Sequence, residues 1–123
     1  MSLIVTGSVG IDTVETPDGQ KAESVLGGSS IYFAAGASFF TKVRLVAAVG
    51  EDFPAHFHDQ FAKFDVCTDG LETRQGSKTF RWHGRYHENM NDRDTLAVEL
   101  NVLGEALPPV PEHYKDSQYV FLA

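Results

Sequence analysis

Apolar residues dominate three short segments that predict buried strands. These segments cover residues 3–5, 43–49 and 118–123, and Arg44 interrupts the second one. A near-continuous apolar run of this length, bounded by turn residues, is typical of a strand that is covered on both faces. The three segments therefore predict the core of a sheet.

Two helices are expected between the strands. A helix capped by Ser29 or Ser30 should extend through Phe40, and its small residues let it lie close against a sheet. Pro54 suits the first position of a second helix that reaches about Phe64. Strands that alternate with helices in this order indicate an α/β sandwich.

Other segments predict a hairpin and an amphipathic strand. Residues 13–16 and 21–26 flank the turn signal Pro17-Asp18-Gly19, which is typical of a hairpin. Residues 79–87 alternate, with aromatic side chains on one face and basic ones on the other. Residues 95–103 fit either a strand or an amphipathic helix.

Composition and charge narrow the class of protein. The chain has 123 residues, 42% hydrophobic, which suits one globular domain. Its net charge of -7 disfavours nucleic acid and anionic membranes as partners. No apolar stretch can span a bilayer, and the N-terminus lacks the basic region of a signal peptide. The lone cysteine, Cys67, excludes an intrachain disulfide and a cysteine-based zinc site. We therefore expect a cytoplasmic protein.

Three segments, in this order, resemble the N-terminal part of the ribokinase-like (PfkB-family) carbohydrate kinases. They are GSVGID at residues 7–12, GGSSIYFAAG at 27–36 and VAAVGED at 46–52. The resemblance implies a ribokinase-like αβα sandwich, Rossmann-like, in which residues 1–123 form a single N-terminal portion with a small β-hairpin lid. The lid strands are expected at about 13–26 and 72–88. The parent enzyme would use ATP and Mg to phosphorylate a hydroxyl of a sugar or nucleoside.

The same resemblance assigns the substrate-binding residues. Asp12 would bind sugar hydroxyls, and an ionised carboxylate can accept two hydroxyl donors. Gly27, Gly28 and Ser29 would lie beside the sugar, where the first helix begins. Tyr32 stands where the family has an asparagine, and a phenol cannot reproduce the bonding of a carboxamide, which bears on the identity of the sugar. From the residues alone, Asp12 could instead be a turn aspartate that bonds its own backbone, and the glycines could merely bend the chain.

The second signature of the family, Gly-x-Gly-Asp with the catalytic base and the anion hole, is absent from this sequence. The chain also ends within an apolar segment, so a truncated and inactive portion is expected. ATP and Mg would then be bound mainly by the missing half, and this chain is assigned no catalytic, cofactor-binding or metal-binding residue. The alternative is a non-catalytic ligand-binding or dimerisation module on the same half-fold. A homodimer through the lid strands would cover the aromatic face.

Three other patterns match known motifs only in part. Gly7 and Gly10 lack the third glycine and the helix of a dinucleotide fingerprint. Residues 76–79 miss the spacing of a P-loop, so a hairpin turn is expected there. His83 and His87 have the spacing of a zinc pair on a helix, but the alternation favours a strand and a solvated face.

Overall fold

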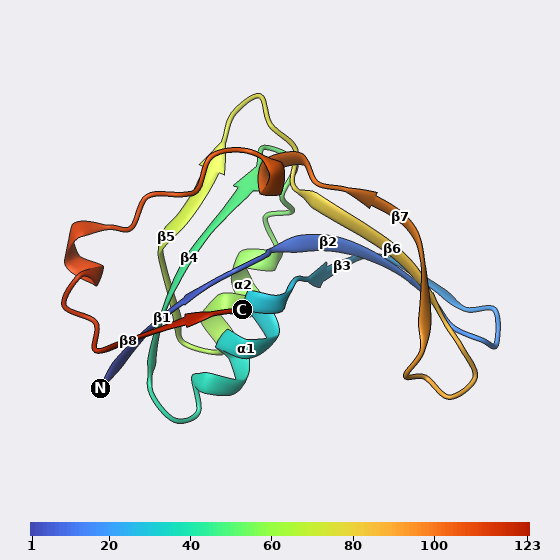
Figure 1. Cartoon of the computed structure of the whole chain (residues 1–123), viewed down its shortest axis with the longest axis horizontal. Coiled ribbons are helices and arrows are strands. Elements are labelled where there is room, and N and C mark those ends of the chain that lie inside the picture. The colour runs from blue at the N-terminus through green and yellow to red at the C-terminus, as the bar shows by residue number, and fades with distance from the viewer.

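The computed structural model describes all 123 residues and contains two four-stranded sheets (Figure 1). In chain order the elements are β1 (Ser2–Thr6), β2 (Gly10–Glu15), β3 (Lys21–Gly27), α1 (Ser29–Ala37), β4 (Lys42–Gly50), α2 (Phe57–Lys63), β5 (Val66–Arg74), β6 (Phe80–Tyr86), β7 (Arg93–Glu99), the 3₁₀ helices η1 (Asn101–Gly104) and η2 (Glu112–Tyr114), and β8 (Tyr119–Leu122). The expected mixture of strands and helices is confirmed.

The core sheet has the strand order β5-β4-β1-β8, and its paired strands are all parallel. Alternate residues of β4, among them Val43 and Leu45, are fully buried against one main hydrophobic cluster, to which α1 contributes Ala34 and α2 contributes Phe57 and Phe61. The apolar runs of β1 and β4 thus form buried strands, as their sequences predict. The prediction for the third run was wrong in one respect: β8 joins the core sheet, but as an edge strand whose residues are all exposed. No helix of the chain is long and apolar enough to cross a membrane.

Tyr114 covers part of the opposite face of the core sheet. Its ring is fully buried and packs with Ile4 and Val46. The phenol donates a hydrogen bond to the carbonyl of Cys67 and accepts one from the N–H of Gly70, both at 3.1 Å. Burial, followed by the hydrogen bond with Cys67, raises the pKa of Tyr114. One side chain therefore fixes the segment before β8 to strand β5.

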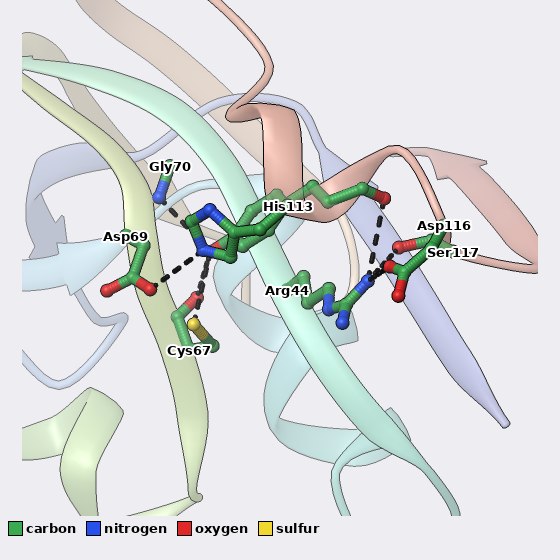
Figure 2. A network of polar contacts seen from close by, with 8 residues as sticks. Arg44, Cys67, Asp69, Gly70, His113, Asp116 and Ser117 are labelled. Atoms are coloured by element: carbon green, nitrogen blue, oxygen red, sulfur yellow. Dashed lines mark hydrogen bonds and ion pairs between the residues drawn. The ribbon is translucent and has the colours of Figure 1, made fainter.

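Arg44 strengthens this attachment from β4. Its guanidinium lies 5.5 Å from the centre of the Tyr114 ring. It also forms an ion pair with Asp116 and donates a hydrogen bond of 2.8 Å to Ser117, as Figure 2 shows. The charged residue that interrupts the apolar run of β4 thus binds the connector to β8.

The second sheet, which we call the lid sheet, has the order β3-β2-β6-β7. Strands β2 and β6 are parallel, while β3 and β7 are antiparallel to their neighbours. The expected lid segment 72–88 differs from the structure at its start, because residues 72–74 pair with β4 in the core sheet. The ambiguous segment 95–103 divides into the end of β7 and the helix η1.

Both helices differ from prediction at their ends. Neither serine caps α1: Gly28 is the N-cap, and the hydroxyl of Ser8 accepts the N–H of Ser29 at 2.9 Å. Helix α1 ends at Ala37, before residues 38–40 form a turn. Helix α2 begins at Phe57 instead of Pro54, and residues 55–56 form a turn before it.

The segment after β4 joins the core sheet to the lid sheet. The carboxylate of Asp52 accepts the N–H of Thr79 at 2.7 Å and a hydrogen bond from the Arg81 guanidinium at 2.8 Å. A second contact joins the same two segments: the hydroxyl of Thr79 accepts a hydrogen bond of 3.0 Å from the N–H of Gly50. Burial alone would raise the pKa of Asp52, but the bonds from Arg81 and Thr79 outweigh it and lower that pKa. These contacts fix the start of β6 to the end of β4.

Candidate functional site

Asp12 lies within strand β2 and not in a turn. The pairing of β2 with β3 shifts register directly after it, and its parallel partner on β6 is Trp82. The side chain is half-buried, and burial raises the pKa of Asp12. Burial is the one cause of this shift, so no hydrogen bond or ion pair within the chain stabilises the charge. The carboxylate is therefore an acceptor with free capacity.

Gly27 lies directly against this carboxylate at the end of β3. A Cβ atom built on Gly27 would be 2.0 Å from Oδ2 of Asp12, far inside van der Waals contact. The position therefore has no room for a side chain while Asp12 keeps its orientation. This glycine makes space for the carboxylate and is not just a flexible joint.

Gly28 is required by the backbone around it. Its φ angle is 109°, a conformation that favours glycine, and a Cβ atom would lie 2.2 Å from the carbonyl oxygen of Ser8. The next residue, Ser29, is exposed and its hydroxyl lies 3.1 Å from that of Ser8. Gly28 thus joins β3 to α1 beside the loop after β1, in a conformation that favours glycine.

Tyr32 extends from the first turn of α1 toward the lid sheet. Its side chain is largely exposed, at 67%. Partial burial, then the charge of Asp12 and then Tyr86, raise the pKa of the Tyr32 phenol. Both side chains line the same pocket, which explains why the charge of Asp12 affects the Tyr32 phenol.

These residues surround an open pocket of about 470 Å³ between α1 and the lid sheet. Of the predicted site residues, Asp12, Gly28, Ser29 and Tyr32 line it, and Gly27 contacts the carboxylate from the side. Arg93 brings the single positive charge among the lining residues. The complete lining consists of Ser8, Asp12, Gly28, Ser29, Tyr32, Phe80, Trp82, Tyr86, Arg93 and Thr95.

Six of these ten lining residues were not assigned to the site from the sequence. The alternation in β6 indicated that Phe80, Trp82 and Tyr86 share a face, but not that this face meets Asp12. That relationship follows from the parallel pairing of β2 with β6, in which Gly10 faces Phe80 and Asp12 faces Trp82. Ser8 lies in the GSVGID segment but was given no role there, and no sequence signal marked Arg93 or Thr95.

The opposite face of the lid sheet carries charged pairs. The carboxylate of Glu15 lies 3.1 Å from Nε2 of His83 and 3.4 Å from the Arg85 guanidinium. His87 lies 3.1 Å from Asp94. The two histidines thus have separate carboxylate partners, and the chain contains no group of three or more His, Cys, Asp or Glu side chains that could hold a metal ion.

A second hollow, of about 460 Å³, lies between β3, α1 and α2. Its lining is mainly apolar and includes Leu26, Phe57 and Phe61, with no carboxylate. A ligand rich in hydroxyls is bound best by a charged acceptor, which this hollow lacks, so the pocket around Asp12 is the better candidate site.

Solved structures define the class of protein to which this arrangement corresponds. A fructokinase from Halothermothrix orenii superposes with a TM-score of 0.76 at 16% identity, over 99% of this chain and 46% of its own. A ribokinase from Cryptococcus neoformans in complex with ADP gives 0.73 at 19% identity, over 98% and 41% of the two chains. The chain therefore has the ribokinase-like α/β fold, and its resemblance to the ribokinase-like kinases is confirmed.

One kinase is similar in sequence as well. Cytidine kinase from Thermococcus kodakarensis is 32% identical over 122 residues, which cover 96% of this chain. The same match covers 41% of the cytidine kinase, so the chain spans about two fifths of the length of this relative. No protein-family model matches the chain.

Proposed function

We propose that this chain is the substrate-binding portion of an ATP-dependent kinase that phosphorylates a hydroxyl of a nucleoside or sugar. One observation carries the proposal: a half-buried carboxylate, Asp12, faces a pocket with no partner for its charge. Ligand hydroxyls would supply the missing donors. The kinases that resemble the chain, named for cytidine, fructose and ribose, act on compounds that carry such hydroxyls.

Each predicted site residue has a role in this proposal. Asp12 accepts hydrogen bonds from two neighbouring hydroxyls, and Gly27 leaves the space that the carboxylate needs. Gly28 and Ser29 bring backbone and hydroxyl groups to the floor of the pocket. The exposed phenol of Tyr32 closes one side, where it can form one hydrogen bond or stack on a ring.

The phosphate donor belongs to the proposal by resemblance. A ribokinase with this fold was crystallised with ADP, which supports ATP as the cofactor. By the same resemblance, ATP and Mg would be bound mainly by the half of the kinase that residues 1–123 do not include, so we assign neither to these residues. Phosphoryl transfer depends on positioning and charge stabilisation around the phosphates, so these residues alone should be inactive. We also propose a cytoplasmic location, no nucleic-acid or membrane partner, and a homodimer through the lid strands.

Binding measurements on the natural gene product that contains this chain test the proposal. We expect Asp12→Ala to weaken nucleoside or sugar binding about a hundredfold or more, because two hydrogen bonds to a charge, each worth roughly 1.5–3 kcal/mol, are lost. Asp18→Ala is the matched control, since it removes the same charge from the exposed turn of the same hairpin. Unchanged substrate affinity in a normally folded Asp12→Ala variant would refute the site assignment.

A further inference from the structure

Trp82 lies beside Asp12 on the neighbouring strand β6 of the lid sheet. The two residues are register partners in the parallel pair β2 and β6, so their side chains leave the same face of the sheet. Both line the pocket. A ligand whose hydroxyls bind Asp12 therefore lies beside the indole ring.

Three contacts fix the orientation of this indole. Its Nε1 donates a hydrogen bond of 3.1 Å to the hydroxyl of Thr95 on β7. The outer edge of the ring covers Gly84, where a Cβ atom would be only 1.9 Å from the indole. The ring of Tyr86 meets it edge to face, with centroids 6.5 Å apart. Each contact comes from a different residue of β6 or β7, so the ring is held before any ligand arrives.

The chain around Trp82 is adapted to this ring in two ways. Gly84 is buried and is the register partner of Thr95, so the glycine under the ring and the acceptor of its N–H lie side by side. The pairing of β6 with β7 also shifts register directly before Gly84. A pocket wall prepared without ligand is typical of a binding surface, because it reduces the ordering needed on association.

We infer that Trp82 is a substrate-binding residue that stacks on the base of a nucleoside, and that Thr95 is its positioning residue. The inference rests on the proposed function, in which Asp12 binds the hydroxyls of the same ligand. Four of the ten lining residues, Phe80, Trp82, Tyr86 and Tyr32, are aromatic. An aromatic base presents the planar face that such a surface favours.

Binding of cytidine and of ribose to the natural gene product separates the two roles. We expect Trp82→Leu to weaken cytidine binding roughly five- to 150-fold, the usual range for loss of one base-stacking side chain. Ribose binding should stay unchanged, because ribose has no base. Phe39→Leu, which alters an exposed aromatic residue outside the pocket, is the control and should affect neither ligand.

Fluorescence gives a readout that does not depend on activity. Trp82 is the single tryptophan of this chain, and the Trp82→Phe variant isolates its signal by difference. Cytidine should quench that signal and ribose should not. Thr95→Val should shift the emission of Trp82 without ligand and weaken cytidine binding, and Thr95→Ser, which keeps the hydroxyl, should restore both.

The outcomes distinguish this inference from the proposed function. If Asp12→Asn weakens the binding of both ligands while Trp82→Leu changes neither, the stacking role is wrong and the proposed function stands. Equal weakening of cytidine and ribose by Trp82→Leu in a folded protein also overturns the stacking role. If the protein binds no nucleoside or sugar, both claims are overturned.

Discussion

The carboxylate of Asp12 fills the space into which a side chain at Gly27 would project, since a Cβ atom there would lie 2.0 Å from Oδ2. The two residues are 15 positions apart, on neighbouring strands of the lid sheet. Asp12, the proposed acceptor of the substrate hydroxyls, can therefore keep this orientation only because Gly27 on the adjacent strand has no side chain.

Gly27→Ala should therefore disturb the position of the Asp12 carboxylate without changing Asp12 itself. The methyl group must displace the carboxylate, so substrate binding should weaken at least tenfold, which corresponds to about 1.4 kcal/mol of lost binding free energy. Calorimetric titration with cytidine and ribose measures it. Gly36→Ala is the matched control, because no atom lies within 4 Å of a Cβ built there. That change lies within α1 and should stabilise the fold by about 0.5–1 kcal/mol.

Asp12→Asn should raise stability at neutral pH while it weakens substrate binding. Burial raises the pKa of Asp12 above its unfolded value, so the folded state disfavours the ionised form. The stabilising effect of Asn relative to Asp should be present above the folded-state pKa and should vanish as pH falls below the ordinary value of 3.8. Urea unfolding of both proteins across this range checks the sign. Lower stability of the variant at pH 7 would contradict an uncompensated charge at this position.

The sequence predicts features that depend on one short segment better than features that depend on the pairing of distant strands. The strands β1 and β4 follow from their apolar runs, and the turn at Pro17-Asp18-Gly19 indicates the hairpin of β2 and β3. Strand β7 was ambiguous because all seven of its residues are exposed, so no burial pattern distinguishes a strand from a helix. Its position beside β6 is a property of the folded sheet.

In the candidate site, too, some residues could be located from their own segments, while other contacts depend on strand pairing. The segments that carry Asp12, Gly27, Gly28, Ser29 and Tyr32 could be located through a family resemblance, and the structure brings them together. The cap of α1 was misassigned because Ser8, which accepts the N–H of Ser29, is 21 residues away. The indole contact with Thr95 likewise depends on the pairing of β6 with β7. Contacts of this kind require strand register, which no single segment specifies.

Tyr114→Phe tests the attachment of the connector to the core sheet. The variant leaves the N–H of Gly70 and the carbonyl of Cys67 without their shared partner in a fully buried place. We expect a loss of about 1–3 kcal/mol in the free energy of unfolding, measured by urea denaturation, with unchanged substrate affinity. Tyr119→Phe alters an exposed tyrosine and should cost less than about 0.5 kcal/mol. Equal stability of the two variants would show that the buried phenol contributes nothing.

Substitution of Asp52 tests how strongly this side chain connects the core sheet to the lid sheet. The exposed fraction of this side chain is 16%, and it binds both the N–H of Thr79 and the guanidinium of Arg81. Asp52→Ala should lower the free energy of unfolding by about 1–3 kcal/mol, because it leaves the buried N–H of Thr79 unpaired, whereas water can hydrate the exposed Arg81 guanidinium. It should also change the emission of Trp82, one residue beyond Arg81. Glu51→Ala is the control, since its carboxylate forms only exposed contacts, with Gly76 and Lys78, worth less than about 1 kcal/mol.

The pH dependence of the same contact gives an independent check. The pKa of Asp52 is lower in the folded state than in the unfolded state, so its contribution to stability is complete above pH 3.8. That contribution should disappear as pH falls through the lowered folded-state pKa. The stability difference between wild type and Asp52→Asn should therefore be constant from pH 7 to about pH 5 and decrease in acid. A difference that persists unchanged at the lowest pH would mean that the carboxylate charge does not hold Arg81, and that the lid is fixed by the backbone of Thr79 alone.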